Sequence, residues 1–156
     1  MNEDDILEIN HLSSSASFRI SLESIRNGEH GLNEARRKLL QRVPETGDWA
    51  LYPRDSISIK DLAYISAKVR HEFALLRGKR KDILFHGSAG RCDLGEELID
   101  LLRTRKYRLV AHTHPDYDRI VPSEKDRAFL KYINQDSSII VSYITGEQET
   151  FYQGMF

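Results

Sequence analysis

The sequence has one cysteine, Cys92, among 156 residues, so a disulfide within the chain is impossible and a reducing compartment is expected. It contains no apolar run long enough to cross a bilayer, and the acidic residues 1–5 do not resemble a signal peptide. Neither charge sign dominates, because 23 basic residues face 24 acidic ones, and this balance argues against a nucleic-acid partner. We expect a cytoplasmic protein without a membrane segment.

The chain also lacks internal repeats, and its length suits one domain with a substantial core. Residues 1–55 are expected to form an N-terminal extension, with a strand over 18–22 and a helix over 32–43. Residues 46–55 contain glycine and proline and are expected to connect this extension to the core. The core domain is expected over residues 56–156.

Within the core, helical and strand patterns alternate. Ser58 and Asp61 form a capping-box pattern ahead of a helix, and Asp93 is expected to open another. The expected elements are helices over 59–70, 93–106 and 123–132 and strands over 72–76, 83–86, 107–111, 138–144 and 150–152. This order predicts an α/β fold with a mixed β-sheet flanked by helices.

The most informative motif pairs two histidines with a following serine and aspartate. His112 and His114 are two residues apart on an expected strand and would project from the same face. Ser123 and Asp126 begin the next helix, so Asp126 lies on its first turn and can return toward the imidazoles. Two imidazole nitrogens and one carboxylate form the ligand set of a catalytic zinc with an open position for water.

Each half of this motif also has an ordinary explanation. The Ser123–Asp126 pair is a capping box, and most capping boxes serve only to begin a helix. A histidine pair at this spacing can arise by chance in a chain with six histidines. The conjunction of both halves, with Pro115 and Pro122 framing the loop between them, favours the metal site.

The run HTHPDYDRIVPSEKD, residues 112–126, resembles the JAMM (MPN+) metalloprotease motif, in which H-x-H-P leads to S-x-x-D. The resemblance extends over residues 57–156 and implies the JAMM/MPN fold with its cytidine-deaminase-like core, in a compact prokaryotic-like member. It implies that His112, His114 and Asp126 bind Zn²⁺. It also implies that Ser123 stabilises the tetrahedral intermediate and that a glutamate on an early strand acts as general acid and base.

The segment from His71 to Gly78 is similar to the family's glutamate-bearing strand, which makes Glu72 the expected catalytic glutamate. The alternative for Glu72 is a solvated carboxylate that follows the helix over 59–70. One departure concerns the loop over 115–122, which has eight residues where the family has seven. A bulge in this loop would absorb the extra residue at small entropic cost.

The resemblance implies a zinc-dependent hydrolase that cleaves a peptide or isopeptide bond, including one at the tail of a ubiquitin-like protein. Its partner would then be a protein or peptide substrate. The alternative is an MPN-like protein-binding scaffold with little catalytic activity, and Glu72 discriminates between the two. A related domain that acts on a non-protein substrate is a third hypothesis.

The remaining reactive or charged residues have simpler interpretations. His71 and His86 have no ligand-like spacing and are expected to be exposed or satisfied by hydrogen bonds. Cys92 has no partner that suggests a nucleophile. The basic clusters over 77–81 and 103–106 are expected to be solvated, with an acidic partner surface as the alternative.

Overall fold

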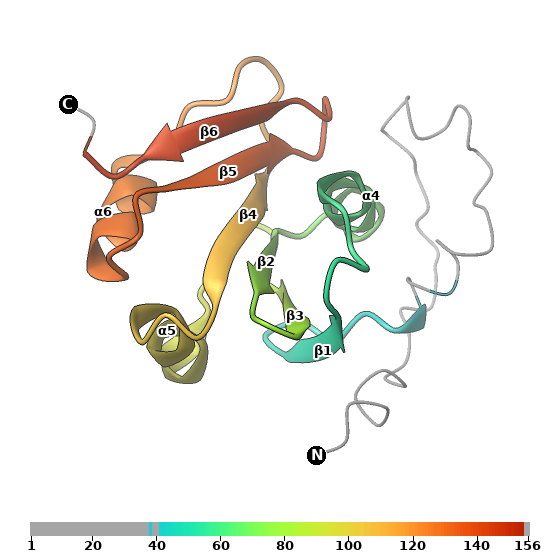
Figure 1. The fold of residues 1–156 in the computed structure, drawn as a ribbon. Coiled ribbons are helices and arrows are strands. Elements are labelled where there is room, and N and C mark those ends of the chain that lie inside the picture. The colour runs from blue at the N-terminus through green and yellow to red at the C-terminus, as the bar shows by residue number, and fades with distance from the viewer. Residues whose placement is uncertain (1–37, 39–40, 155–156) are drawn as a thin grey trace.

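The computed structural model describes residues 38 and 41–154 (Figure 1). The expected strand over 18–22 lies outside these residues, and so do eight of the twelve residues of the expected helix over 32–43, of which residues 38 and 41 are described as helical. What is described contains the whole region in which the sequence places the metal motif.

A six-stranded mixed sheet forms the centre of the fold, in the order β1-β3-β2-β4-β5-β6 (Figure 1). Only β4 and β5 are parallel neighbours, and α6 connects them. The strands are β1 (Trp49–Pro53), β2 (Phe73–Arg77), β3 (Lys81–His86), β4 (Arg108–His114), β5 (Ser137–Ser142) and β6 (Gln148–Tyr152). The predicted α/β class with a mixed sheet is therefore confirmed.

Helices cover both faces of this sheet. They are α4 (Ile59–Val69), α5 (Gly95–Arg103) and α6 (Glu124–Tyr132). Helix α4 lies on one face and α5 and α6 lie on the other, as Figure 1 shows. Two apolar clusters fill the layers: Leu62, Ile65 and Phe73 belong to the α4 side, whereas Leu98 and Leu130 belong to the side of α5 and α6.

The expected connector over 46–55 is wrong, because its middle five residues form strand β1, which pairs antiparallel with β3. The side chains alternate in burial, with Ala50 and Tyr52 in the core. Pro53 is tolerated because it ends a strand that has one partner in the described sheet. The sheet therefore starts seven residues before position 56, where the core domain was expected to begin.

Two helices begin at complete capping boxes, as predicted. In α4 and α6 the N-cap serine, Ser58 or Ser123, accepts a hydrogen bond from the backbone of the residue three positions later. The third helix differs from the prediction. Helix α5 begins at Gly95, and its N-cap residue Leu94 makes no side-chain capping bond, so Asp93 does not open it.

An irregularity in the pairing of β2 with β4 determines which β4 side chains lie on the same face of the sheet as His112. Leu76 pairs with Leu109 and Leu75 pairs with Ala111, which leaves Val110 as an extra residue on β4. A bulge of this kind shifts the alternation of side chains by one position. Leu109 therefore shares a face with His112, on the side of α5 and α6.

Candidate metal centre

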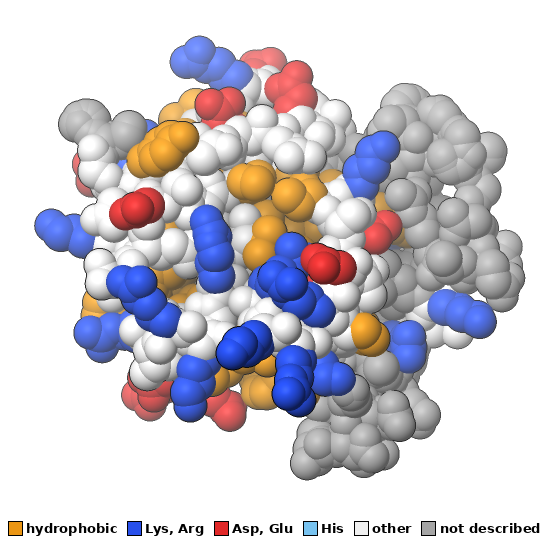
Figure 2. Space-filling model, viewed as in Figure 1, with side chains coloured by type: hydrophobic (Ala, Val, Ile, Leu, Met, Phe, Trp, Pro, Cys, Tyr) orange, Lys and Arg blue, Asp and Glu red, His pale blue; other side chains and the backbone are white. Residues whose placement is uncertain are grey.

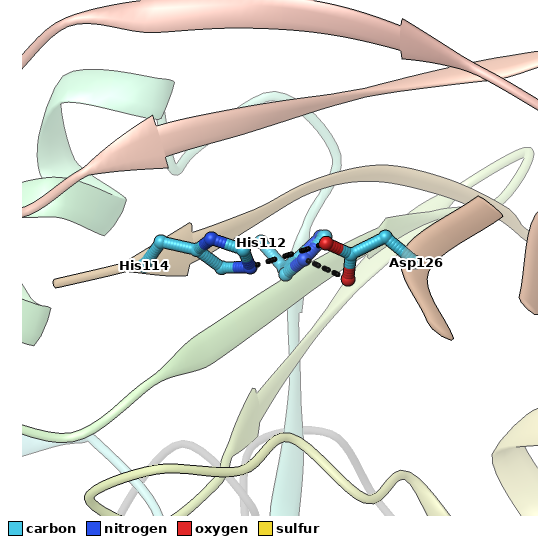
Figure 3. Close-up of side chains that lie close together, drawn as sticks. All are labelled: His112, His114 and Asp126. Atoms are coloured by element: carbon cyan, nitrogen blue, oxygen red, sulfur yellow. Dashed lines mark hydrogen bonds and ion pairs between the residues drawn. The ribbon is translucent and has the colours of Figure 1, made fainter. Parts of the chain in front are cut away.

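The three predicted ligands converge between β4 and α6. His112 and His114 lie on β4 and Asp126 on the first turn of α6, and their ligand atoms lie within 4.8 Å of one another (Figure 3). The Nε2 atom of His112 lies 3.2 Å from Oδ1 of Asp126, and Nε2 of His114 lies 3.5 Å from Oδ2. The cluster of His112, His114 and Asp126 can hold a metal ion.

The His114 ring has a second carboxylate on its other side. Its Nδ1 atom lies 3.3 Å from Oδ2 of Asp116. A carboxylate beside that nitrogen favours a proton on Nδ1, so that Nε2 could offer its lone pair to a metal ion in place of its proton. Asp116 was not predicted from the sequence, although its place two residues after His114 in the motif loop was a usable signal.

The capping box that begins α6 also fixes Asp126, the third candidate ligand. The Ser123 backbone donates to Oδ2 of Asp126 over 2.8 Å, and the Asp126 backbone donates to the Ser123 hydroxyl over 3.0 Å. The carboxylate therefore approaches the imidazoles in one orientation. The two expected uses of this pair, helix cap and metal site, are compatible rather than exclusive, and the longer loop over 115–122 does not prevent the approach.

The electrostatics of the cluster suit a cation. Burial raises the pKa of Asp126, but hydrogen bonds from His112 and His114 outweigh it and hold that pKa well below its usual range. Burial lowers the pKa of His114, but the adjacent Asp126 carboxylate outweighs this effect and raises it. A metal-free site thus favours a proton on His114, and a divalent cation would take the place of that positive charge.

Glu72 lies immediately before β2 and is 9% exposed, so the solvated alternative for this residue is wrong. Burial raises the pKa of its carboxyl to about 7, with further contributions from Asp126 and Asp116 and an opposing one from His114. Such a carboxyl exchanges its proton near neutral pH, which is the property required of a general acid and base. Its main chain is bonded on both sides, to Gly87 over 2.7 Å and to Ser88 over 2.9 Å.

A chain of hydrogen bonds on the α4 face ties this glutamate to the ligand strand. The Phe73 backbone donates to the Thr113 hydroxyl over 2.8 Å, and Thr113 lies 2.7 Å from Ser66. The Ser66 hydroxyl donates to the His71 carbonyl, so it accepts the Thr113 proton. The residues on either side of Glu72 are thereby linked to the residue between His112 and His114. No sequence signal identified this function of Thr113.

All five predicted site residues line one open cavity of about 450 Å³. Its wall is mixed, with apolar and cationic side chains that face the metal ligands. Its lining comprises Glu72, Ala74, Gly90, Arg91, Cys92, Asp93, Leu94, Leu109, His112, His114, Ser123, Lys125, Asp126, Phe129 and Phe151. The structure therefore brings together side chains from β2, β4 and α6 that the sequence separates by up to 54 positions.

His71, His86 and Cys92 were predicted to have no catalytic role, and their contacts in the structure are consistent with that prediction. His86 donates from Nδ1 to the Pro44 carbonyl over 2.7 Å, so its Nε2 accepts from His71 over 2.8 Å. Burial lowers the pKa of both rings, as expected of neutral, satisfied histidines. Burial also raises the pKa of the Cys92 thiol above its usual range, which disfavours a nucleophilic thiolate, although Cys92 does line the cavity.

No helix within the described part of the chain is long and apolar enough to cross a membrane. No family model matches the sequence, and neither a curated protein nor a solved structure matches it.

Proposed function

We propose that this chain is a zinc-dependent hydrolase of the JAMM/MPN+ type that cleaves a peptide or isopeptide bond. One observation carries the proposal: His112, His114 and Asp126 converge in a cavity that Glu72 and Ser123 also line. A structural capping box needs neither the two imidazoles nor a buried glutamate beside it. A catalytic zinc site with two histidine ligands, one carboxylate ligand and a glutamate base uses all of these groups.

Two imidazoles and a carboxylate are the donors that zinc prefers when it keeps one open position, so this set of residues fits the ion. His112, His114 and Asp126 would hold it. When bound, zinc would supply a water made acidic enough to attack a carbonyl at neutral pH. Asp116 would orient His114 through Nδ1, a contact that typically strengthens metal sites.

Two further side chains would complete the reaction. Glu72 would accept the proton of the attacking water and return it to the leaving amine, and its pKa of about 7 suits both steps. The Ser123 oxygen accepts a hydrogen bond from the Asp126 backbone, which leaves the hydroxyl proton to be donated to the developing oxyanion. The fold holds each group in place before a substrate arrives. Groups that are already oriented stabilise the transition state more strongly, because they need not reorganise during the reaction.

The cavity wall supports a polypeptide substrate. Leu94, Phe129 and Phe151 present apolar surface, while Arg91 and Lys125 place cations in the same lining. An extended chain could place an apolar side chain near the cleaved bond against the apolar wall, and its backbone carbonyls or acidic groups against the cations. The tail of a ubiquitin-like protein is one such chain, and we propose it as the first substrate to test.

Elemental analysis of the purified protein tests the metal centre directly. We expect about one zinc per chain in the wild type, a loss of zinc in His114→Ala, and retention in Glu72→Gln, because only the histidine is a ligand. Glu96→Gln is the matched control, since Glu96 is an exposed carboxylate outside the cavity. Negligible zinc in folded wild-type protein supplied with the metal would refute the hydrolase and leave the protein-binding scaffold.

Hydrolysis tests the second half of the proposal. The substrate is a ubiquitin-like protein whose C-terminal tail carries an amide-linked fluorophore, together with a peptide library that covers unrelated sequences. Glu72→Gln should lower kcat about 10²–10⁴-fold while zinc content is unchanged, because general acid–base catalysis contributes that factor. Equal rates in Glu72→Gln and Glu96→Gln would remove Glu72 from the mechanism.

A further inference from the structure

Two basic segments that are distant in sequence meet at one end of the sheet. One is the β2–β3 turn, residues 77–81, and the other is the connection from α5 to β4, residues 105–108. Together with Arg54 they line an open hollow of about 890 Å³, called here the basic hollow. Figure 2 shows Lys and Arg side chains gathered over the lower half of this face, with hydrophobic atoms beside them.

The basic hollow concentrates positive charge in a chain that is nearly neutral. Eight of its eleven lining residues are Lys or Arg, and no lining residue is acidic. The chain has 23 such residues, so about a third of them lie here although the net charge is −1. Arg77 is neutralised by Asp82 at 3.0 Å and Asp55 at 3.4 Å, but Lys79 and Lys106 extend into solvent.

Like charges held this close repel one another, so the arrangement favours a ligand that brings negative charge. Solvation alone explains single surface cations, which was the expectation for each cluster taken separately. Solvation does not explain why two basic clusters that are far apart in the sequence meet on one concave surface. The convergence supports the alternative considered for them, an acidic partner surface.

The apolar part of the lining favours a polypeptide over a nucleic acid. Val110 and the Tyr107 ring contribute apolar surface, and Tyr107 packs so closely on Gly78 that a Cβ there would lie 2.7 Å from its Cε2. Apolar surface among charged side chains is typical of a protein interface. Binding of single-stranded nucleic acid relies on exposed aromatic faces for stacking, whereas Tyr107, the one aromatic residue in this lining, is half-buried.

The position of the basic hollow relates it to the metal centre. Strand β2 runs from Phe73, next to Glu72, to Arg77, and β4 runs from Arg108 to His114. The metal centre and the basic hollow thus lie at opposite ends of the same two strands, roughly 20 Å apart at about 3.3 Å per residue. A protein bound at one end can reach the other.

We propose that the basic hollow binds an acidic segment of the protein that the metal centre cleaves. The identification of the ligand as the substrate protein rests on the proposed function, whereas the binding itself does not. Because the basic hollow is separate from the cavity around the metal ligands, charge changes there would alter KM for an acidic substrate more than kcat.

Fluorescence anisotropy with the full chain tests the binding. The probes are a short labelled peptide rich in Glu with a few Leu, the same peptide with Gln in place of Glu, and a labelled single-stranded DNA of equal length. The triple variant Lys79→Glu, Arg80→Glu and Lys106→Glu reverses exposed charges of the basic hollow. Lys60→Glu is the control, because Lys60 is exposed at the start of α4, where a carboxylate is favourable.

We expect the acidic peptide to bind the wild type and Lys60→Glu equally, and the triple variant at least about tenfold more weakly. Binding should also weaken as ionic strength rises. Equal binding of the Gln peptide, no binding of the acidic peptide, or an unchanged affinity in the triple variant would overturn the proposal. Tighter binding of the DNA would overturn it in favour of a nucleic-acid surface.

This outcome is independent of the metal centre. If the protein lacks zinc but binds the acidic peptide through these residues, the proposed hydrolase fails and the binding surface stands. If zinc and hydrolysis are found, a substrate with an acidic segment should show a raised KM in the triple variant and an unchanged kcat. An equal KM for wild type and triple variant would refute the role in substrate recruitment.

Discussion

Replacement of Gly87 by alanine should damage the protein next to its candidate catalytic glutamate. A Cβ at position 87 would lie 2.4 Å from the Arg91 carbonyl oxygen and 2.8 Å from that of Glu72, where ordinary contact begins at 3.4 Å. Both neighbours are backbone atoms, so one peptide unit must move by about 1 Å, an overpacking that costs about 1–3 kcal/mol. The movement also strains the hydrogen bond from Gly87 to Glu72, worth about 1 kcal/mol.

The free energy of unfolding should therefore fall by about 2–4 kcal/mol, which for a chain of this size lowers Tm by about 6–12 °C. Thermal and urea denaturation measure this change. Gly90→Ala is the matched control: it lies in the same loop, and a Cβ there would meet nothing within 4 Å. A Tm for Gly87→Ala within 1–2 °C of that of Gly90→Ala, on the order of the scatter expected for surface substitutions, would refute the close approach.

Three further predictions concern the ligands and their support. Zinc at about one hundred times its Kd should stabilise the wild type by about 2.7 kcal/mol, while a thermal-shift assay of His114→Ala should show no zinc response. In metal-free protein, the wild type should lose stability relative to Glu72→Gln as pH rises from 4.5 to about 7, because burial raises the pKa of Glu72 and the folded state keeps a proton that the unfolded state releases. A parallel pH profile for the two proteins would contradict that pKa. Thr113→Val should cost about 1–3 kcal/mol in urea denaturation, because the Phe73 amide loses its buried acceptor, whereas the exposed Thr150→Val should change little.

The sequence predicts those parts of the fold and site that depend on short-range patterns. Capping boxes at Ser58 and Ser123 mark helix starts, and both are present. The two-residue spacing of His112 and His114 places both rings on one face of a strand because side chains alternate. These patterns involve only residues close together in the sequence, so they can be recognised without knowledge of tertiary contacts.

What the sequence does not predict depends on contacts between distant segments. The glycine before β1 and the proline at its end suggest a connector, whereas the pairing of β1 with β3 depends on residues 28 to 36 positions away. The extra residue Val110 in β4 leaves no local pattern. Thr113 meets Phe73 and Ser66 only when β4 packs against β2 and α4.

The double use of Asp126 has a consequence for how this chain can change over time. The carboxylate that would hold the metal is also the one that accepts the backbone hydrogen bond at the start of α6. A lineage that gave up the metal by mutating Asp126 would also weaken this helix, by about 1 kcal/mol if the capping bond is lost. A variant that loses the metal by substitution of either histidine therefore keeps its helix start, whereas one that loses it by substitution of Asp126 does not. Relatives that have lost the metal should retain an acidic or amide side chain at this position.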